Sequence, residues 1–180
     1  LQPARPVALV TGAAGGIGST ICVDLQSHGW DVVAADVAGS DLPDGADVVE
    51  VDIRSASSCR AAVDHVAARH PRLDLLVNNA GINARGNAED VPDDVWEAVV
   101  DVNLNGTFRM CRAAFPMLTA SRGSIVNLSS SGALVAIAGS AIYGVTKAAS
   151  THTTRGRAGE WSTRGVLVNA VAPTIVDTAM

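Results

Sequence analysis

Pro6-Val-Ala-Leu-Val10 is an apolar run that leads directly into Thr11-Gly-Ala-Ala-Gly-Gly-Ile-Gly18, and these thirteen residues decide the fold. An apolar run of this length is typical of a buried strand. After the glycines, Ile21, Leu25 and Trp30 recur at roughly helical spacing among polar residues. The stretch therefore predicts a strand, a glycine-rich loop and a helix, in that order.

The spacing of the glycines indicates a site for a phosphate-bearing ligand. Gly12 permits a tight turn, and Gly16 and Gly18 carry no side chains, so that a pyrophosphate can reach the helix N-terminus, where free N–H groups and the helix dipole favour anions. A plain glycine turn is the alternative, but the strand before the loop and the helix after it favour a nucleotide. We therefore predict cofactor contacts at Gly12, Gly15, Gly16, Ile17 and Gly18.

A second predicted strand, Asp31-Val-Val-Ala-Ala-Asp36, ends in a carboxylate eighteen residues after Gly18. An acid at about this distance can accept hydrogen bonds from the ribose hydroxyls of an adenosine. The same charge would repel a 2′-phosphate, and no basic residue lies in the glycine loop or directly after Asp36. The sequence therefore favours NAD over NADP, with an ordinary aspartate at a strand end as the alternative.

The remainder of the chain continues the alternation of strands and helices. Further strands are predicted at 48–52, 74–78, 123–128 and 165–171, and helices at 56–70, 91–120 (with a break near Gly106) and 141–161. This pattern predicts the α/β class, with a doubly wound parallel sheet (a Rossmann fold) in a single domain over residues 1–180. Ligands of such sheets bind at the carboxyl ends of the strands. The residues predicted at those ends are Gly12, Asp36, Asp52, Asn79, Ser130 and Pro173.

Composition excludes several classes of protein. Hydrophobic residues make up 48% of the chain and charged residues 17%, which excludes a disordered chain. The net charge of −5 and the lack of a basic block argue against a nucleic-acid groove or a membrane surface as partner. Cys22, Cys59 and Cys111 are odd in number and far apart, which favours free thiols in a reducing compartment and hence the cytoplasm. No His or Cys pair has ligand spacing, so we predict no catalytic metal.

Tyr143 is the only tyrosine of the chain and Lys147 is its only lysine. They lie four positions apart in the predicted helix 141–161, so the phenol and the ammonium group share one helical face. The alternative is an ordinary surface pair whose polar ends reach into solvent.

Taken together, these residues resemble the short-chain dehydrogenase/reductase family in its compact, non-extended branch. The resemblance covers nearly the whole chain, and Ser130 precedes Tyr143 by thirteen residues, as the family pattern requires. The stretches that carry it are the glycine loop, Asp52, Asn78-Asn-Ala-Gly81, Asn103, Ser130, Tyr143-Gly-Val-Thr-Lys147 and Asn169-Ala-Val-Ala-Pro173.

The resemblance implies a role for each matching residue. Tyr143 would be the general acid/base, Lys147 its cationic helper and a ribose ligand, and Ser130 the partner of the substrate oxygen. Asn103 would hold a proton-relay water. The implied cofactor contacts are Asp52 and Ile53 beside the adenine, Asn79, Ala80 and Gly81 beside the adenosine half, and Pro173, Ile175 and Thr178 at the nicotinamide end.

The implied role of Tyr143 requires a lowered pKa. The ordinary pKa of tyrosine is ~10, and lowering it by three units costs roughly 4 kcal/mol. A unit charge ~4 Å away supplies about that much at an effective dielectric of ~20. We therefore expect Lys147 and an oxidised nicotinamide together to bring the phenol near working pH.

The chain departs from the family pattern at two places. Thr174 follows Pro173 where glycine is usual, and a β-branched residue resists positive φ, so we expect a different backbone near the nicotinamide. We also expect the sheet to be truncated after the sixth strand, which is then an exposed edge. The family's substrate-covering loop and seventh strand do not occur within the 180 residues, and our hypothesis is a shortened or incompletely represented chain.

The function that follows is an NAD-dependent oxidoreductase that interconverts a secondary alcohol and a ketone. Polyols, sugars, hydroxysteroids and 3-hydroxyacyl thioesters all remain open as small-molecule substrates. The alternatives are an NADPH-dependent ketoreductase of the same family, such as the 3-oxoacyl type, and a catalytically silent nucleotide-binding module. The resemblance also implies a homo-oligomer, a dimer or tetramer, paired through the helices near 101–120 and 141–161.

Overall fold

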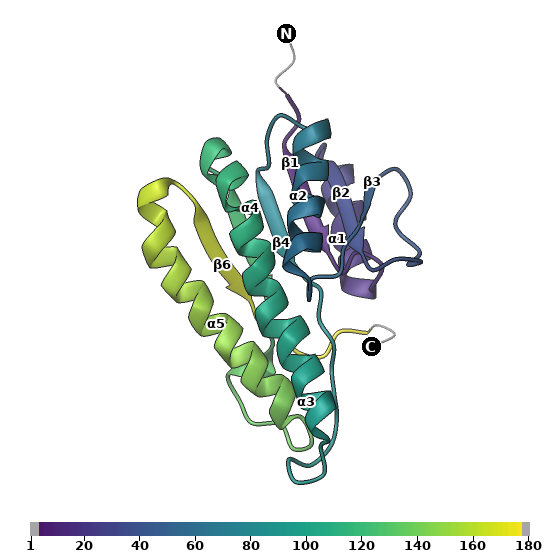
Figure 1. Ribbon diagram of the computed structural model, residues 1–180, viewed down its shortest axis with the longest axis vertical. Coiled ribbons are helices and arrows are strands. Elements are labelled where there is room, and N and C mark those ends of the chain that lie inside the picture. Colours follow the sequence, from purple (N-terminus) through teal and green to yellow (C-terminus); the bar gives the residue numbers. More distant parts are fainter. Residues whose placement is uncertain (1–3, 178–180) are drawn as a thin grey trace.

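A twisted sheet of parallel strands forms the centre of the protein, whose computed structural model describes residues 4–177 (Figure 1). The strand order is β3-β2-β1-β4-β5-β6, and every neighbouring pair is parallel. This is the order of the doubly wound dinucleotide-binding fold, so the predicted fold class is confirmed. The strands are β1 (Val7–Thr11), β2 (Asp31–Asp36), β3 (Asp47–Glu50), β4 (Leu75–Asn78), β5 (Ser124–Leu128) and β6 (Leu167–Val171).

The helices lie on both faces of this sheet. Helices α2, α4 and α5 cover the face turned toward the viewer in Figure 1, and α1 lies behind it. A π-helical turn, η1 (Asp101–Gly106), joins α3 to α4, and two short 3-10 turns are η2 (Ser131–Ala133) and η3 (Ser162–Arg164). The α-helices are α1 (Gly16–Ser27), α2 (Ala56–Arg69), α3 (Asp93–Val100), α4 (Thr107–Ser121) and α5 (Ala141–Trp161).

Strand β1 explains why the glycine loop has a fixed position. All five of its residues are buried, because successive side chains point to opposite faces and both faces are covered by helices. Leu9 belongs to the core shared with α2 and α4, whereas Val10 belongs to the core under α1. The chain therefore leaves β1 at a rigid point in the middle of the sheet.

The predicted boundaries of β2 and α5 are confirmed to the residue. Strand β3 is shorter than predicted and ends at Glu50, so Asp52 lies in the following loop. Within residues 4–177, β6 is an edge strand that pairs with β5 alone, and its side chains Leu167 and Val171 are exposed. No helix in that part of the chain is long and apolar enough to cross a membrane.

The predicted break near Gly106 is wrong. Gly106 has helical dihedral angles (φ −61°, ψ −48°), and the chain passes through it from η1 into α4 without leaving helical geometry. The glycine is needed for packing, because a Cβ at this position would lie 2.6 Å from Cδ1 of Ile53. The helix widens to a π turn here and is not interrupted.

Candidate active site

The glycine loop after β1 is tied to the turn after β4. The side-chain amide of Asn79 donates to the carbonyl oxygens of Thr11 (3.2 Å) and Gly12 (2.9 Å). The Thr11 hydroxyl accepts from the backbone N–H groups of Asn79 and Ala80, both at 3.2 Å. Gly12 has φ +66°, and a Cβ there would lie 2.7 Å from Cα of Ala80. The sequence-predicted residues at these two strand ends are therefore brought together.

The start of α1 has the form of an anion site. Gly15 is the N-cap and supplies no side chain, so the first-turn N–H groups of α1 are not capped by a side chain of the described residues. A Cβ on Gly18 would lie 2.1 Å from the carbonyl oxygen of Gly12, so only glycine allows the loop to close against the helix. Free N–H groups and the positive end of the helix dipole suit a pyrophosphate.

Asp36 lies at the end of β2 beside the glycine loop. Its carboxylate accepts hydrogen bonds from the backbone N–H groups of Ala14 (2.9 Å) and Val37 (2.8 Å). A carboxylate can accept about four hydrogen bonds, so Asp36 keeps capacity for two hydroxyl donors. This aspartate both holds the loop and remains able to bind a ribose.

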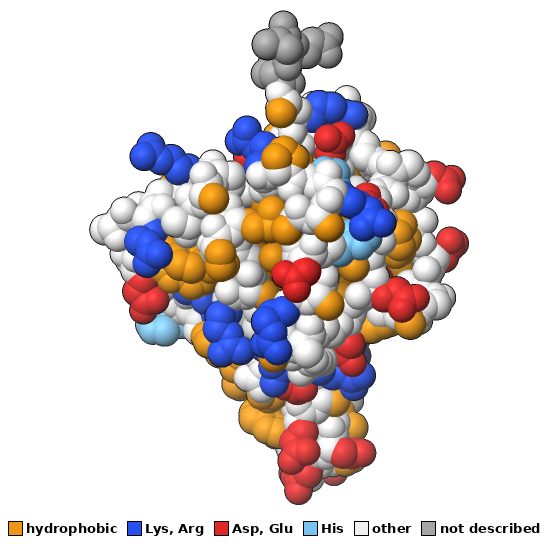
Figure 2. Space-filling view, turned by 45° about the horizontal axis from the view of Figure 1, so that its top comes forward, with side chains coloured by type: hydrophobic (Ala, Val, Ile, Leu, Met, Phe, Trp, Pro, Cys, Tyr) orange, Lys and Arg blue, Asp and Glu red, His pale blue; other side chains and the backbone are white. Residues whose placement is uncertain are grey.

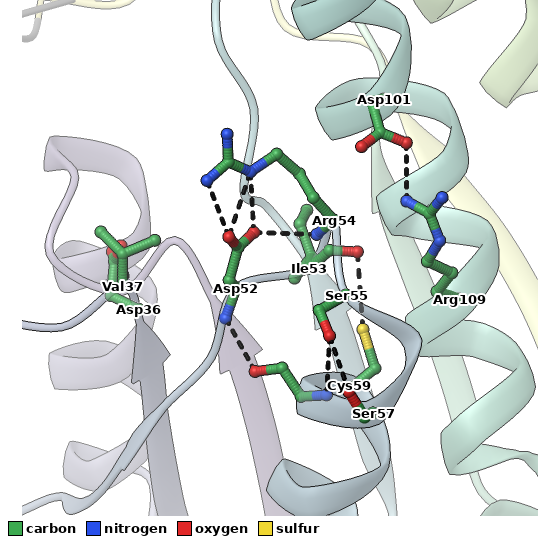
Figure 3. A network of polar contacts seen from close by, with 11 residues as sticks. Asp36, Val37, Asp52, Ile53, Arg54, Ser55, Ser57, Cys59, Asp101 and Arg109 are labelled. Carbon is green, nitrogen blue, oxygen red and sulfur yellow. Dashed lines mark hydrogen bonds and ion pairs between the residues drawn. The ribbon is translucent and has the colours of Figure 1, made fainter.

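Asp52 lies in the loop after β3 and is engaged by a single arginine (Figure 3). Arg54 contacts both carboxylate oxygens through its guanidinium group, at 2.7 to 3.1 Å, and its backbone N–H adds a further hydrogen bond. These contacts occupy the accepting capacity of Asp52. The hydrogen bonds from Arg54 lower the pKa of Asp52 despite an opposing effect of burial.

The neighbouring Ile53 is buried, with 6% of its surface exposed, and it packs against Gly106. Its carbonyl oxygen accepts a hydrogen bond from the Cys59 thiol at 3.6 Å. Ile53 therefore forms an apolar wall next to Asp52, and Figure 3 shows it beside Asp52 on the side toward α4.

Tyr143 and Lys147 share one face of α5, as predicted. The Lys147 ammonium nitrogen lies 5.5 Å from the centre of the Tyr143 ring. It donates a 2.7 Å hydrogen bond to the carbonyl oxygen of Leu128, the last residue of β5. Lys147 is only 5% exposed, and this hydrogen bond holds its ammonium group between α5 and the end of β5.

Two consecutive serines after β5 have different roles. Ser130 caps η2 by accepting from the N–H of Gly132 at 3.1 Å, and its hydroxyl lies near enough to Tyr143 to influence the pKa of the phenol. Ser129 is buried and pairs with the Thr151 hydroxyl at 2.6 Å. The spacing argument therefore selects the serine that lies near the phenol, while its neighbour attaches β5 to α5.

Asn103 lies in the π turn η1 and is 1% exposed. Its side chain pairs with the backbone of Ile82, accepting at 2.8 Å and donating at 2.9 Å, and it also donates to the Thr146 hydroxyl at 3.2 Å. A Cβ on Gly81 would lie 3.2 Å from Oδ1 of Asn103 and 3.5 Å from Nζ of Lys147. Asn103 thus joins the turn after β4 to α5, beside Lys147.

The structure describes only part of the segment after β6 that was predicted to lie at the nicotinamide. The carbonyl oxygen of Pro173 accepts from the N–H of Ser131 at 2.8 Å, which brings this segment to the serine loop. Thr174 has no positive φ, since Arg122 is the one non-glycine residue with positive φ in residues 4–177. Ile175 is 98% exposed, and Thr178 lies outside the described residues.

Burial acts in opposite directions on the two central groups. It raises the pKa of Tyr143, although the nearby Ser130 hydroxyl lowers it in part. It lowers the pKa of Lys147 to about 8, because a buried ammonium ion loses its hydration. The chain alone therefore keeps the phenol protonated, and a further positive charge is needed to ionise it.

These features fit a dinucleotide. The uncapped start of α1 suits the phosphates, Asp36 retains acceptor capacity for a ribose, and the positions of Gly12 and Gly18 leave no room for a side chain. The described residues contain no cluster of three or more His, Cys, Asp or Glu suited to a metal ion.

Sequence reasoning missed several residues of the site. Arg54, Thr146 and Thr151 contact Asp52, Asn103 and Ser129, respectively. The short spacing of Asp52 and Arg54 was a visible signal for an ion pair. No sequence signal marks the Leu128 carbonyl, because every residue has one.

Comparisons with known proteins agree with this geometry. Residues 6–180 match the family described as short chain dehydrogenase. The chain is 39% identical to a D-threitol dehydrogenase of Mycolicibacterium smegmatis, over 97% of this chain and 71% of that protein. It is 36% identical to a 3-oxoacyl-(acyl-carrier-protein) reductase of Staphylococcus aureus, over 96% of this chain and 75% of that protein.

A solved structure supports the same conclusion. The aldohexose dehydrogenase of Thermoplasma acidophilum, in ligand-free form, superposes with a TM-score of 0.91 at 31% sequence identity. The alignment covers 97% of this chain and 68% of that chain. The chain therefore belongs to the short-chain dehydrogenase/reductase family.

Proposed function

We propose that this protein oxidises a secondary alcohol to a ketone with NAD, using Tyr143 as general base. As a member of its family, the chain is an NAD(P)-dependent oxidoreductase acting on CH–OH groups. The observation that carries the specific proposal is the pairing of Tyr143 and Lys147, since the only phenol and the only ammonium side chain of the protein lie 5.5 Å apart at the strand ends.

In this proposal each polar group has one role, in proton transfer, in charge stabilisation or in positioning. Tyr143 Oη takes the proton of the substrate hydroxyl, and the Ser130 hydroxyl holds the same oxygen as it becomes a carbonyl. The Lys147 ammonium, fixed on the Leu128 carbonyl, stabilises the phenolate form of Tyr143. Asn103 holds the turn at Gly81 and Ile82 against α5.

Other residues would hold the dinucleotide. The loop from Gly12 to Gly18 and the start of α1 would bind its pyrophosphate, and Asp36 its adenosine ribose. Asp52, Ile53 and the turn from Asn79 to Gly81 would line its adenine half, and Pro173, Ile175 and Thr178 would lie at its nicotinamide end. When bound, oxidised NAD supplies the hydride acceptor and a positive charge near the phenol.

The preference for NAD over NADP rests on Asp36. Its carboxylate lies on the glycine loop and would repel a 2′-phosphate. Neither the loop nor the residue after Asp36 offers a compensating cation. The competing function is an NADPH-dependent ketoreductase, which the similarity to the 3-oxoacyl reductase favours.

The substrate proposed is a polyol or a sugar. The similarity to a D-threitol dehydrogenase and to an aldohexose dehydrogenase supports a substrate of this class. A silent nucleotide-binding module is disfavoured because Ser130, Tyr143 and Lys147 are all present and lie close together.

We also infer a homo-oligomer in the cytoplasm, formed through α4 and α5. Phe108 on α4 is exposed, which supports an association face there. Cys22, Cys59 and Cys111 are free and buried, which supports a reducing compartment.

The test is an absorbance assay of NAD and NADP reduction against threitol, glycerol, aldohexoses and a 3-hydroxyacyl thioester. We expect reduction of NAD with a polyol or an aldohexose. Faster reduction of NADP than of NAD would contradict the proposed cofactor. Faster oxidation of NADPH with a 3-oxoacyl thioester would contradict both the cofactor and the direction. Binding of NAD without turnover of any substrate would favour the silent module.

A further inference from the structure

A hollow of about 300 Å³ lies between α2 and α4, apart from the catalytic residues. Its charged lining comprises Arg60 and Asp64 from α2 and Arg109 and Arg112 from α4. Basic side chains gather near the middle of the face seen in Figure 2, over these helices. The hollow is thus mainly cationic in a protein of net charge −5.

The cations of this hollow are incompletely paired. Among residues 4–177, neither Arg60 nor Arg112 forms an ion pair. The Arg112 guanidinium lies over the Phe108 ring at 5.2 Å, and Arg157 lies over the same ring at 5.3 Å. Arg157 lies outside the lining of the hollow and is 7% exposed, and its buried Nη1 has no hydrogen-bond partner among the described residues. Two cations on one ring leave a local excess of positive charge.

We propose that this hollow binds a small phosphate monoester and that its occupancy strengthens binding of the dinucleotide. Planar guanidinium groups match phosphate oxygens in paired hydrogen bonds, and arginine is therefore the preferred phosphate ligand among basic residues. Arg60, Arg109 and Arg112 line the hollow from two helices, and in this proposal the dianion binds among their guanidinium groups.

A row of alternating charges, made of two separate ion pairs, lies between this hollow and the adenine end of the site (Figure 3). Arg109 forms a 2.7 Å ion pair with Asp101. Asp101 and Arg54 line a second hollow, of about 480 Å³, and Arg54 forms a 2.7 Å ion pair with Asp52. Although burial opposes it, the hydrogen bonds of Arg109 and Asn105 and the charges of Arg109 and Arg54 lower the pKa of Asp101.

Occupancy of the first hollow changes the strength of the Arg109–Asp101 and Arg54–Asp52 ion pairs. A bound dianion competes with Asp101 for Arg109, and the less neutralised Asp101 then attracts Arg54. Arg54 in turn releases accepting capacity on Asp52, whose carboxylate can then accept from the adenine amino group. This coupling rests on the proposed function, because it requires a dinucleotide beside Asp52, and it is reciprocal.

The first experiment measures the hollow alone. Inorganic phosphate and glycerol 3-phosphate are titrated separately into NAD-saturated protein by calorimetry, with sodium chloride matching the ionic strength, so that the glycine loop is filled. We expect saturable binding of glycerol 3-phosphate, weaker binding of inorganic phosphate, and at least a tenfold loss of affinity in the Arg60→Gln/Arg112→Gln double variant. Arg155→Gln, an exposed arginine of α5 outside the lining, is the matched control and keeps binding.

Equal binding in the double variant, or no saturable heat, overturns the site. If the carboxylates of a second copy fill the hollow instead, no heat appears and the double variant has a lower mass by light scattering, which also overturns the proposal. If NAD does not bind, the proposed function fails. The difference in phosphate affinity between the NAD-free wild type and double variant then still decides the site.

The second experiment measures the coupling. Tryptophan fluorescence gives the Kd for NAD with and without glycerol 3-phosphate. We expect the phosphate ester to tighten NAD binding by a factor of about 1.5 to 5, the range of exposed ion pairs. Arg54→Gln should remove this effect while leaving phosphate binding to the NAD-free protein unchanged. A phosphate effect that persists in Arg54→Gln contradicts the row of charges as the route.

Discussion

The catalytic end and the adenine end of the site hold their charged groups in different ways. At the catalytic end, Lys147 is 5% exposed and its ammonium group is bound to a backbone carbonyl of the sheet. At the adenine end, the side chains of Asp52 and Arg54 are 39% and 56% exposed and bind each other. The fold therefore fixes the first charge, whereas the second pair is adjustable and screened by solvent.

The largest effect is expected from Tyr143→Phe at the catalytic end. Removal of the phenol oxygen removes the proton acceptor, so turnover should fall by roughly 10² to 10⁴-fold, the range for general acid–base catalysis. The variant should bind NAD with nearly the wild-type Kd, measured by calorimetry, because the ring remains. Turnover within threefold of wild type would show that another group takes the proton.

The next effect concerns the buried charge of Lys147. Its pKa of about 8 lies below the ordinary value of 10.5, so above pH 8 the unfolded chain binds a proton that the folded chain does not. The stability of wild type should therefore rise relative to Lys147→Met as pH increases, by about 2 kcal/mol between pH 7 and pH 9.5. Urea denaturation of both proteins at pH 7, 8 and 9.5 measures this difference. A difference in free energy of unfolding that does not change with pH would mean that burial does not lower the pKa of Lys147.

A smaller effect is expected at Asp36, at the end of β2, which lies between β3 and β5 in the sheet. Asp36→Asn keeps an acceptor for the Ala14 N–H but removes the charge that repels a 2′-phosphate. The ratio of kcat/KM for NAD over NADP should fall by about tenfold, equivalent to about 1.4 kcal/mol. An unchanged ratio in a variant with an unchanged Tm would show that this carboxylate does not set the cofactor preference.

The smallest effect is expected at the adenine end. Asp52→Asn breaks an exposed ion pair, which should change the free energy of unfolding by less than about 1 kcal/mol. The Kd for NAD should change by a factor of about 5 or less, and the change should shrink at high salt. A loss as large as that in Tyr143→Phe would mean that the two ends are held alike, against the contrast drawn above.

The sequence predicted the catalytic end better than the adenine end for a physical reason. The contact between Tyr143 and Lys147 follows from local helical spacing, and α5 begins and ends at the predicted residues. The position of the Lys147 ammonium depends on the Leu128 carbonyl, a backbone atom that leaves no mark in a sequence.

The errors lie where packing between distant segments decides the outcome. The π turn η1 replaces the break expected near Gly106, because that glycine admits Ile53 from another loop. The assignment of Asp52 to the adenine, made from the family resemblance, stays a prediction, and the short spacing to Arg54 was the unused signal of their ion pair. The parallel sheet itself was predictable, because its alternation of apolar runs and helical patterns is local.

The most direct test of the proposed chemistry is a titration of the phenol, followed by ¹³C NMR of protein labelled at tyrosine. Tyr143 is the only tyrosine, so one signal reports its ionisation without assignment. In the free protein, burial should hold its pKa above the ordinary value. With NAD bound, the pKa should fall by about two to three units, because a second positive charge joins Lys147 beside the phenol. The same pKa with and without NAD would contradict a phenol activated by the bound cofactor.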